Sequence, residues 1–315
     1  MDLLGFVVLN GLLYGTLLFM LAAGLTLIYG LMGVINFAHA SFYMVGAYLA
    51  YQASVWWNFW AALIVVPILM ALLGGLMRRW LIAPLAIENH LGQLLLTFGV
   101  AVAVTELVQI IWGKLAMNYP IPAGMTAPLF RIGGLEFSTY RFFVLAVSIL
   151  LFVAIALVVT RTRIGLLLSA AQTQPQMVRS LGYDLDRLFD GVFAAGAAVA
   201  GVAGVLGGNL MGVYPVMADQ VSALLFVIVC VGGLGSLAGA FIVAITIGML
   251  ETLATTYKVS MRPLIESLFG VPAPDTLLND LARISSTSFA PMMPYLLMVV
   301  VLLFMPRGLF GKRDL

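Results

Sequence analysis

Apolar residues fill most of the chain in long uninterrupted runs, and the charged residues fall between those runs. Between Asp2 and Arg78 there are 75 consecutive residues without Asp, Glu, Lys or Arg. A helix rises about 1.5 Å per residue and the hydrocarbon core of a bilayer is about 30 Å thick, so this run is long enough for about three crossings. Further charge-free runs, each close to the length of one span, cover 89–105, 142–160, 191–218, 220–250 and 284–306. The pattern predicts a polytopic membrane protein.

The breaks in these runs predict nine helical spans. The 32 glycines of the chain favour closely packed helices and do not fit the alternating pattern of a membrane β-barrel. The segment 219–232 is short and lies between the glycine pairs 207–208 and 232–233, so a half-helix that lowers the count to eight stays open. The predicted fold class is all-α with eight to nine transmembrane helices, with spans at 5–32, 37–54, 59–77, 91–113, 140–160, 188–211, 219–232, 236–257 and 288–305.

Composition agrees with this pattern and excludes other classes of protein. Hydrophobic residues make up 63% of the chain and charged residues 9%, whereas an average soluble domain has about 25% charged residues. The runs leave no room for a soluble domain. The formal net charge is only +2 and no basic run interleaves with aromatic residues, so nucleic acid is excluded as a predicted partner. The single cysteine, Cys230, forms no intrachain disulfide.

The loop charges predict the orientation in the membrane. Positively charged loops stay in the cytoplasm. Alternating the loops places nine of the fifteen basic residues on one face, which we assign to the cytoplasm together with the C-terminus; with nine spans the N-terminus lies outside. The opposite face carries the longer loops 114–139 and 258–289. The nine cytoplasmic residues are Arg78, Arg79, Arg161, Arg163, Arg179, Arg187, Arg307, Lys312 and Arg313.

The loop 161–187 is the largest cytoplasmic feature, and its residues predict a short helix between two spans. Pro175 suits a first helical turn, and Gly182 suits a C-terminal stop. Asp184 is placed to cap the next span. A solvated connector and a docking helix for a cytoplasmic partner are both open interpretations of this loop.

Few ionisable or strongly polar residues lie within the apolar runs, and each needs a reason to be there. Glu106 shares a helical stripe with Gly99 and Val102, so we expect it to face a neighbouring helix or a cavity. Glu251 follows a stripe of small residues that includes Ala244 and Gly248. Interhelical hydrogen bonding and lining of a pathway are both open. The candidate substrate-pathway residues are Asn36, His39, Gln93, Thr97, Glu106, Asn209 and Glu251.

Asn36 and His39 form a polar break between the first two predicted helices. A single histidine within a membrane is more often part of a hydrogen-bonded structure than a proton carrier. Irregular backbone at membrane depth must, however, line protein or water, so a gate or a substrate contact is also plausible here.

Sequence motifs for catalysis or metal binding are absent. The chain has no G-x-x-x-x-G-K-[ST] run, so any ATPase that drives it must be another chain. It has no C-x-x-C or H-E-x-x-H motif, and Ser236 lacks the G-x-S-x-G frame of a hydrolase. The sequence therefore predicts a protein that is not an enzyme, with no catalytic residue, no metal site and no cofactor of its own.

Three segments resemble one family closely: GLTLIYGLMGVINFAH at 24–39, YMVGAY at 43–48 and GGLGSLAGA at 232–240. They are similar to the membrane subunits of Liv-type ABC importers, the branched-chain amino acid transporter family, and weaker matches extend over nearly the whole chain. The resemblance implies a type II-like importer permease fold, a single transmembrane permease domain over 1–315, and a place in the bacterial inner membrane. The chain departs from the family pattern at Ala40, Leu166 and Ser169.

The resemblance also implies partners and a mechanism. They are a second homologous permease subunit, two cytoplasmic ATPase subunits that hold ATP and Mg, and an extracytoplasmic solute-binding protein, beside the membrane lipid. The solute would be an amino acid or a related small polar or organic-acid compound, and the sequence leaves its identity open, as it does the choice between a homodimeric and a heterodimeric permease pair. The implied ATPase-coupling residues are Arg161, Arg163, Gly165, Gln174, Pro175, Met177, Arg179, Gly182 and Tyr183.

One alternative from another class is a proton-coupled secondary transporter. It would use His39, Glu106 and Glu251 as a proton relay through the membrane. The two hypotheses predict opposite energetics, because only the importer needs ATP.

Overall fold

The computed structural model describes residues 2–33, 36–85, 90–132, 135–257, 262–269, 276 and 285–311. Helices dominate these residues, and one antiparallel hairpin of β1 (Pro128–Ile132) and β2 (Leu135–Ser138) precedes α5. The long helices are α1 (Asp2–Met32), α2 (His39–Trp56), α3 (Phe59–Met77), α4 (His90–Trp112), α5 (Thr139–Arg161), α8 (Leu185–Met211), α9 (Met217–Gly232), α10 (Leu237–Thr256) and α14 (Met293–Phe304). The short ones are the π-helix η1 (Arg78–Ile82), α6 (Arg163–Thr173), α7 (Pro175–Ser180), α11 (Arg262–Phe269), α13 (Ser286–Phe289) and the 3-10 helix η2 (Ala290–Met292).

The helices confirm the predicted fold class and most of the predicted spans. Among the described residues, seven helices are long and apolar enough to cross a membrane: α1, α3 with η1, α4, α5, α8, α10, and the stretch from α13 to α14. α2 and α9 lie at the other two predicted positions but are not among the seven. With 16 residues, α9 is about 24 Å long, which is shorter than the hydrocarbon core of a bilayer. This length agrees with the half-helix that the sequence left open for 219–232.

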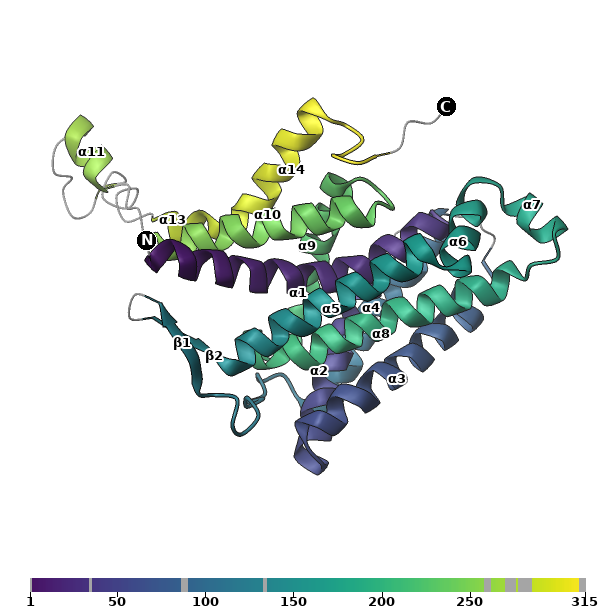
Figure 1. Ribbon diagram of the computed structural model, residues 1–315, viewed down its shortest axis with the longest axis horizontal. Coiled ribbons are helices and arrows are strands. Elements are labelled where there is room, and N and C mark those ends of the chain that lie inside the picture. The colour runs from purple at the N-terminus through teal and green to yellow at the C-terminus, as the bar shows by residue number, and fades with distance from the viewer. Residues whose placement is uncertain are drawn as a thin grey trace.

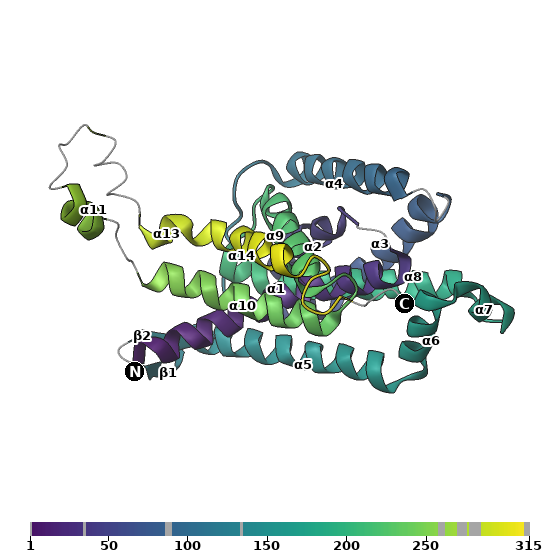
Figure 2. The ribbon, with the colours of Figure 1, turned by 90° about the horizontal axis from the view of Figure 1, so that it is seen from above.

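α1 and α8 form the centre of the bundle. α1 packs mainly against α10 and α8, and α8 packs against α3 and α2. In their most apolar stretches, 67% of α1 and 56% of α8 are buried, compared with 11% of α4 and 17% of α5. α4 and α5 lie at opposite edges of the bundle (Figure 2). Much of the apolar surface of these two edge helices therefore faces away from the chain itself.

Small residues let the central helices approach closely, as the sequence predicted. A Cβ atom at Gly204 of α8 would lie 2.6 Å from the backbone nitrogen of Ala47 and 2.6 Å from the carbonyl oxygen of Tyr43, both on α2. A Cβ atom at Gly248 of α10 would lie 2.5 Å from backbone atoms of α1. Any side chain at these positions would push the helices apart.

The two sets of loops lie at opposite ends of the molecule. α6 and α7 project at one end, and the β1–β2 hairpin lies at the other, beside the first turn of α1 (Figure 1). The segment 114–139 therefore lies at the hairpin end. The loop 258–289 is described only at 262–269, 276 and 285–289. Two of the nine basic residues assigned to the cytoplasmic face, Lys312 and Arg313, lie outside the described residues.

Candidate functional site

His39 and Asn36 are buried where α1 gives way to α2. His39 is 1% exposed, and its Nε2 lies 3.1 Å from the carbonyl oxygen of Leu21. Asn36 accepts a hydrogen bond from the backbone N–H of Ala38 at 3.0 Å. A void of about 10 Å³ touches both side chains and Ser222 of α9. Since one water needs about that much room, this layer is closed to a solute in this conformation.

Gln93 and Thr97 extend the same polar layer from α4. Both are buried, one helical turn apart on the inner face. The Thr97 hydroxyl accepts from the backbone N–H of Phe37 at 3.3 Å and donates to the carbonyl oxygen of Leu94 at 3.1 Å. Thr97 thus attaches α4 to the chain just before α2. The structure therefore brings the neighbouring residues Asn36 and His39 together with Thr97 from a distant segment, and Gln93 lies near Thr97 on α4.

Glu106 faces away from the other helices of this chain, so the predicted contact with a neighbouring helix or a cavity is not made within the described residues. Glu106 is exposed, and a Cβ atom at Gly99 on the same stripe would meet nothing within 4 Å. The inner face of α4 carries Thr97 and Val108 instead. The hydrogen bond from Phe37 to Thr97 sets this rotation of α4, which the spacing of small residues does not reveal. A carboxylate at a helix centre in lipid costs about 2.5–3.5 kcal/mol on insertion scales, and Glu106 is exposed in this chain.

Glu251 lies near a polar cleft at the hairpin end of the bundle. Its carboxylate interacts with the hydroxyl of Tyr14 on α1. The cleft has a volume of about 420 Å³ and runs between α1, α5, α8 and α10. Arg141, at the start of α5, donates from Nη1 to Asn10 Oδ1 at 2.9 Å and forms no ion pair within the described part of the chain. The cleft is lined by Phe6, Asn10, Leu13, Tyr14, Leu17, Arg141, Leu210, Met211, Thr252, Thr255 and Thr256.

This cleft joins one cation, several hydroxyl and amide groups, and aliphatic side chains. That mixture suits a small solute with a carboxylate and an apolar part. The sequence analysis selected Glu251 but did not select Arg141 as a candidate residue. The one available signal was its position, because Arg141 directly precedes a charge-free run.

Asn209 holds an outer loop in place. Its Nδ2 donates to the carbonyl oxygens of Pro120 at 2.6 Å and Tyr119 at 3.2 Å, and its Oδ1 accepts from the Tyr140 hydroxyl at 2.8 Å. Burial raises the pKa of the Tyr119 phenol to about 12, so this side chain stays neutral at physiological pH. Both the oxygen and the nitrogen of the Asn209 amide are therefore hydrogen-bonded within the protein. Asn209 lies against the outer loop and not beside His39.

The segment 161–187 forms two helices. The predicted helix start at Pro175, helix stop at Gly182 and cap at Asp184 are correct. Pro175 occupies the first turn of α7, and Gly182 after it has a φ of +86°. The Asp184 carboxylate caps α8 by accepting from the backbone N–H groups of Asp186 at 3.1 Å and Arg187 at 3.2 Å. A Cβ atom at Gly165 would collide with the backbone of Val159.

Most side chains of this segment point away from the protein. Val178 is the buried residue of α7. α6 and α7 project at one end of the molecule (Figure 1). Their exposed side chains and those of the flanking residues form a surface of mixed apolar and cationic character, which is unusual for a simple connector. Its exposed members are Arg161, Arg163, Gln174, Pro175, Met177, Arg179 and Tyr183.

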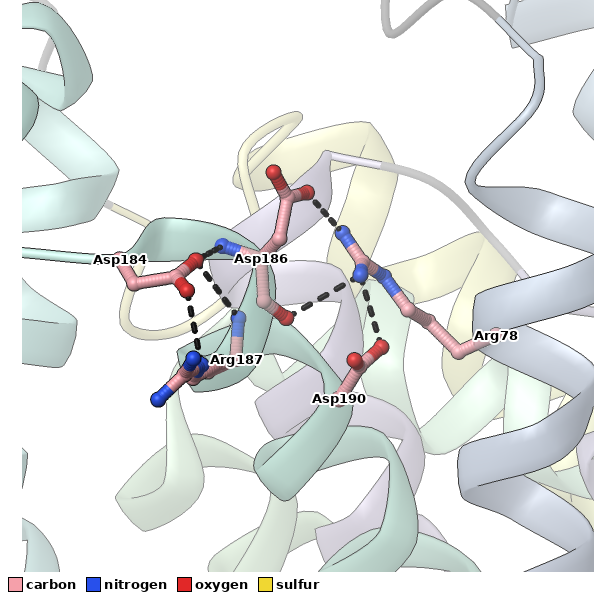
Figure 3. Close-up of polar contacts among 5 residues, drawn as sticks. All are labelled: Arg78, Asp184, Asp186, Arg187 and Asp190. Atoms are coloured by element: carbon pink, nitrogen blue, oxygen red, sulfur yellow. Dashed lines mark hydrogen bonds and ion pairs between the residues drawn. The ribbon is translucent and has the colours of Figure 1, made fainter.

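The sequence analysis missed an ion cluster beside this segment (Figure 3). Arg78, the first residue of η1, is 4% exposed. It donates from Nη2 to Asp186 Oδ1 at 2.7 Å, and from Nη1 to Asp190 Oδ1 at 2.7 Å and to the carbonyl oxygen of Asp186 at 3.1 Å. Its guanidinium carbon lies 5.6 Å from the centre of the Phe189 ring. Arg78 entered the sequence analysis only as one of the cytoplasmic cations.

A bundle of apolar helices with a polar cleft at one end and an exposed helical loop at the other defines a membrane transport protein. The sequence model of one family, described as "Branched-chain amino acid transport system / permease component", matches residues 7–310. The chain belongs to this family, and it is a multi-pass protein of the inner membrane. The resemblance to Liv-type membrane subunits is confirmed.

Named relatives agree with this assignment. The chain is 26% identical to the high-affinity branched-chain amino acid transport system permease protein LivH of Escherichia coli K12, over 97% of this chain and 94% of that protein. It is 26% identical to BraD, the corresponding permease protein of Pseudomonas aeruginosa, over 97% and 95%. It is 30% identical to the probable branched-chain amino acid transport permease protein LivH of Methanocaldococcus jannaschii, over 80% and 81%. No solved structure matches the chain.

Proposed function

We propose that this chain is the transmembrane subunit of an ATP-driven, binding-protein-dependent importer of amino acids or related small polar or organic-acid solutes. The observation that carries the proposal is the family match over 7–310. Two features support it: the sequence has no nucleotide-binding motif, and the exposed α6–α7 segment offers a surface to another chain. The polypeptide itself is not catalytic.

The partners supply what the chain lacks. Two cytoplasmic ATPase subunits bind ATP and Mg and dock on the loop 161–187. A second homologous permease subunit covers part of the bundle, and the exposed face of α4 with Glu106 supports this, because a carboxylate is costly in lipid. An extracytoplasmic solute-binding protein delivers the solute at the hairpin end, where the loops 114–139 and 258–289 meet it. The chain has no cofactor of its own.

The docking segment passes the ATPase motion to the spans. Its coupling residues are those predicted from the family resemblance, from Arg161 to Tyr183. The exposed Met177 and Tyr183 provide apolar contact, and Arg163 and Arg179 provide charge. Gly165 lets α6 turn tightly against the end of α5, and Gly182 ends α7.

The solute enters by the polar cleft at the hairpin end and passes the buried layer at His39. In the cleft, the Arg141 guanidinium binds a carboxylate and the aliphatic side chains receive the rest of the solute. The space beside Asn36 and His39, of only about 10 Å³, supports a gate at that level. Closing of the ATPases opens this gate as the bundle alternates its access.

Proteoliposomes that contain the assembled transporter test this proposal. We expect uptake that stops when ATP is omitted and continues when a protonophore collapses the proton gradient. The reverse result would support the proton-coupled transporter. The positions of its three residues do not favour that relay: His39 contacts α1 at Leu21 and Glu251 contacts it at Tyr14, about 10 Å apart along the helix, and Glu106 lies on the outer face of α4.

A further inference from the structure

The Arg78 cluster fastens α3 to the first two turns of α8. Asp186, Phe189 and Asp190 are spaced i, i+3, i+4 and so share one face of α8, and all three contact the Arg78 guanidinium. The Arg78 side chain is 5% exposed, whereas those of Asp186 and Asp190 are 65% and 29% exposed, so separating the helices would leave a buried cation without its partly solvated partners. Bonds to two successive turns also resist sliding of α3 along α8.

α7 is joined to the start of α8 by the short segment 181–184, whose residues are hydrogen-bonded to both helices. The backbone N–H of Tyr183 donates to the carbonyl oxygen of Val178 at 3.3 Å. Asp184 then caps α8 and forms an ion pair with Arg187 at 2.9 Å (Figure 3). A displacement of α7 is therefore transferred to the first turn of α8, where Arg78 is attached.

α3 and α8 continue as a close pair beyond the cluster. A Cβ atom at Gly201 of α8 would lie 2.7 Å from the side chain of Met70 on α3, and one at Gly74 would collide with Ala197. α3 changes to the π-helix η1 at Arg78 itself. π-Helical turns are rare and occur frequently at functional sites. The cluster thus fastens the irregular end of α3 to the helix that receives the α7 motion.

We propose that the Arg78–Asp186–Asp190 cluster is the joint through which motion of α7 reaches α3, and that Arg78 is a positioning residue of the transport cycle. The proposal rests on the proposed function, in which α7 receives the stroke of the ATPase. With the joint intact, α3 and α8 move with α7 as one unit. Without it, the first turn of α8 bends away from η1, and ATP is hydrolysed while the spans stay in place.

The test measures solute imported per ATP hydrolysed by the assembled transporter in proteoliposomes. The variants are Arg78→Lys, which keeps the charge but cannot bridge two carboxylates with a planar fork, and Asp190→Asn. We expect each to lower this ratio by about tenfold with normal assembly and basal ATPase activity. The double variant should lose no more than either single one, because both remove the same contact. Arg79→Gln is the matched control, since Arg79 is adjacent and exposed, and its ratio should not change.

If both single variants import as much solute per ATP hydrolysed as the wild type, the proposed joint is refuted. The importer proposal would then remain intact. A wild-type transporter without ATP-dependent uptake would refute the importer proposal, and the joint with it. If a variant does not assemble, the distance between two spin labels on α7 and η1 tests the proposed joint instead. In a Cys230→Ser background, labels at Arg79→Cys and Ser180→Cys should keep one distance with and without trapped ATP. A change in that distance in the otherwise wild-type protein would overturn the joint.

Discussion

At the scale of single residues, two glycines of α8 differ in the space around them. A Cβ atom at Gly204 would press on the backbone of α2, whereas one at Gly191 would meet nothing within 4 Å. We expect Gly204→Ala to destabilise the protein by about 1–3 kcal/mol and Gly191→Ala to stabilise it by about 0.5–1 kcal/mol. Thermal unfolding in detergent measures both. Equal shifts in Tm would contradict the close approach of α2 and α8.

Asn209 provides a second test at this scale. A carboxylate in its place has no N–H to donate, so the partly buried bond to the Tyr119 carbonyl oxygen and the exposed bond to that of Pro120 are both lost. We expect Asn209→Asp to destabilise the protein by about 1–3 kcal/mol and to make the outer loop sensitive to proteases. Asn118→Asp is the control, because Asn118 is exposed in the same loop. If both variants behave like the wild type, Asn209 does not hold the loop.

At the scale of the elements, the end of α7 depends on one backbone conformation. Gly182 has a φ of +86° and donates its N–H to the carbonyl oxygen of Arg179 at 2.9 Å. Proline has a φ near −65° and no N–H, so Gly182→Pro should displace α7 from α8. We expect the spans to remain folded while ATP hydrolysis no longer drives transport, as measured by ATPase and uptake assays on one preparation.

Gly124 offers a matched control for that variant. It has the same φ of +86° but lies in the loop before β1, at the hairpin end of the molecule. Gly124→Pro should therefore strain the backbone equally and leave the ATPase-coupled step intact. The same uncoupling in both variants would mean that the effect is general and does not arise at α7.

At the scale of the whole molecule, the two ends should face different compartments. In a Cys230→Ser background, Asn118→Cys in the outer loop should react with a membrane-impermeant thiol reagent in intact cells. Ser180→Cys on α7 should react only after the inner membrane is opened, because the cytoplasmic face carries the arginine-rich loops. Reaction of Ser180→Cys in intact cells would reverse the predicted orientation.

The sequence predicted the elements of this protein well. Spans at 59–77 and 140–160 correspond to α3 (Phe59–Met77) and α5 (Thr139–Arg161), because the length of an apolar run determines whether a helix can cross the bilayer. Pro175 and Gly182 predicted the bounds of α7, because their allowed φ values are local properties. The stripe of small residues before Glu251, with Ala244 and Gly248, lies on the buried side of α10.

Only the tertiary structure decided which side chains meet. The sequence did not show that Glu106 faces away from the rest of the chain, because a stripe of residues does not reveal how a helix is rotated. Arg78 lies 108 and 112 residues before Asp186 and Asp190, and the cleft around Arg141 needs four helices. The sequence by itself therefore determined the helices, the membrane and the family, since burial of apolar runs and backbone restrictions act locally. The ion cluster, the cleft and the polar layer at His39 follow from packing between distant segments, which no single run of residues contains.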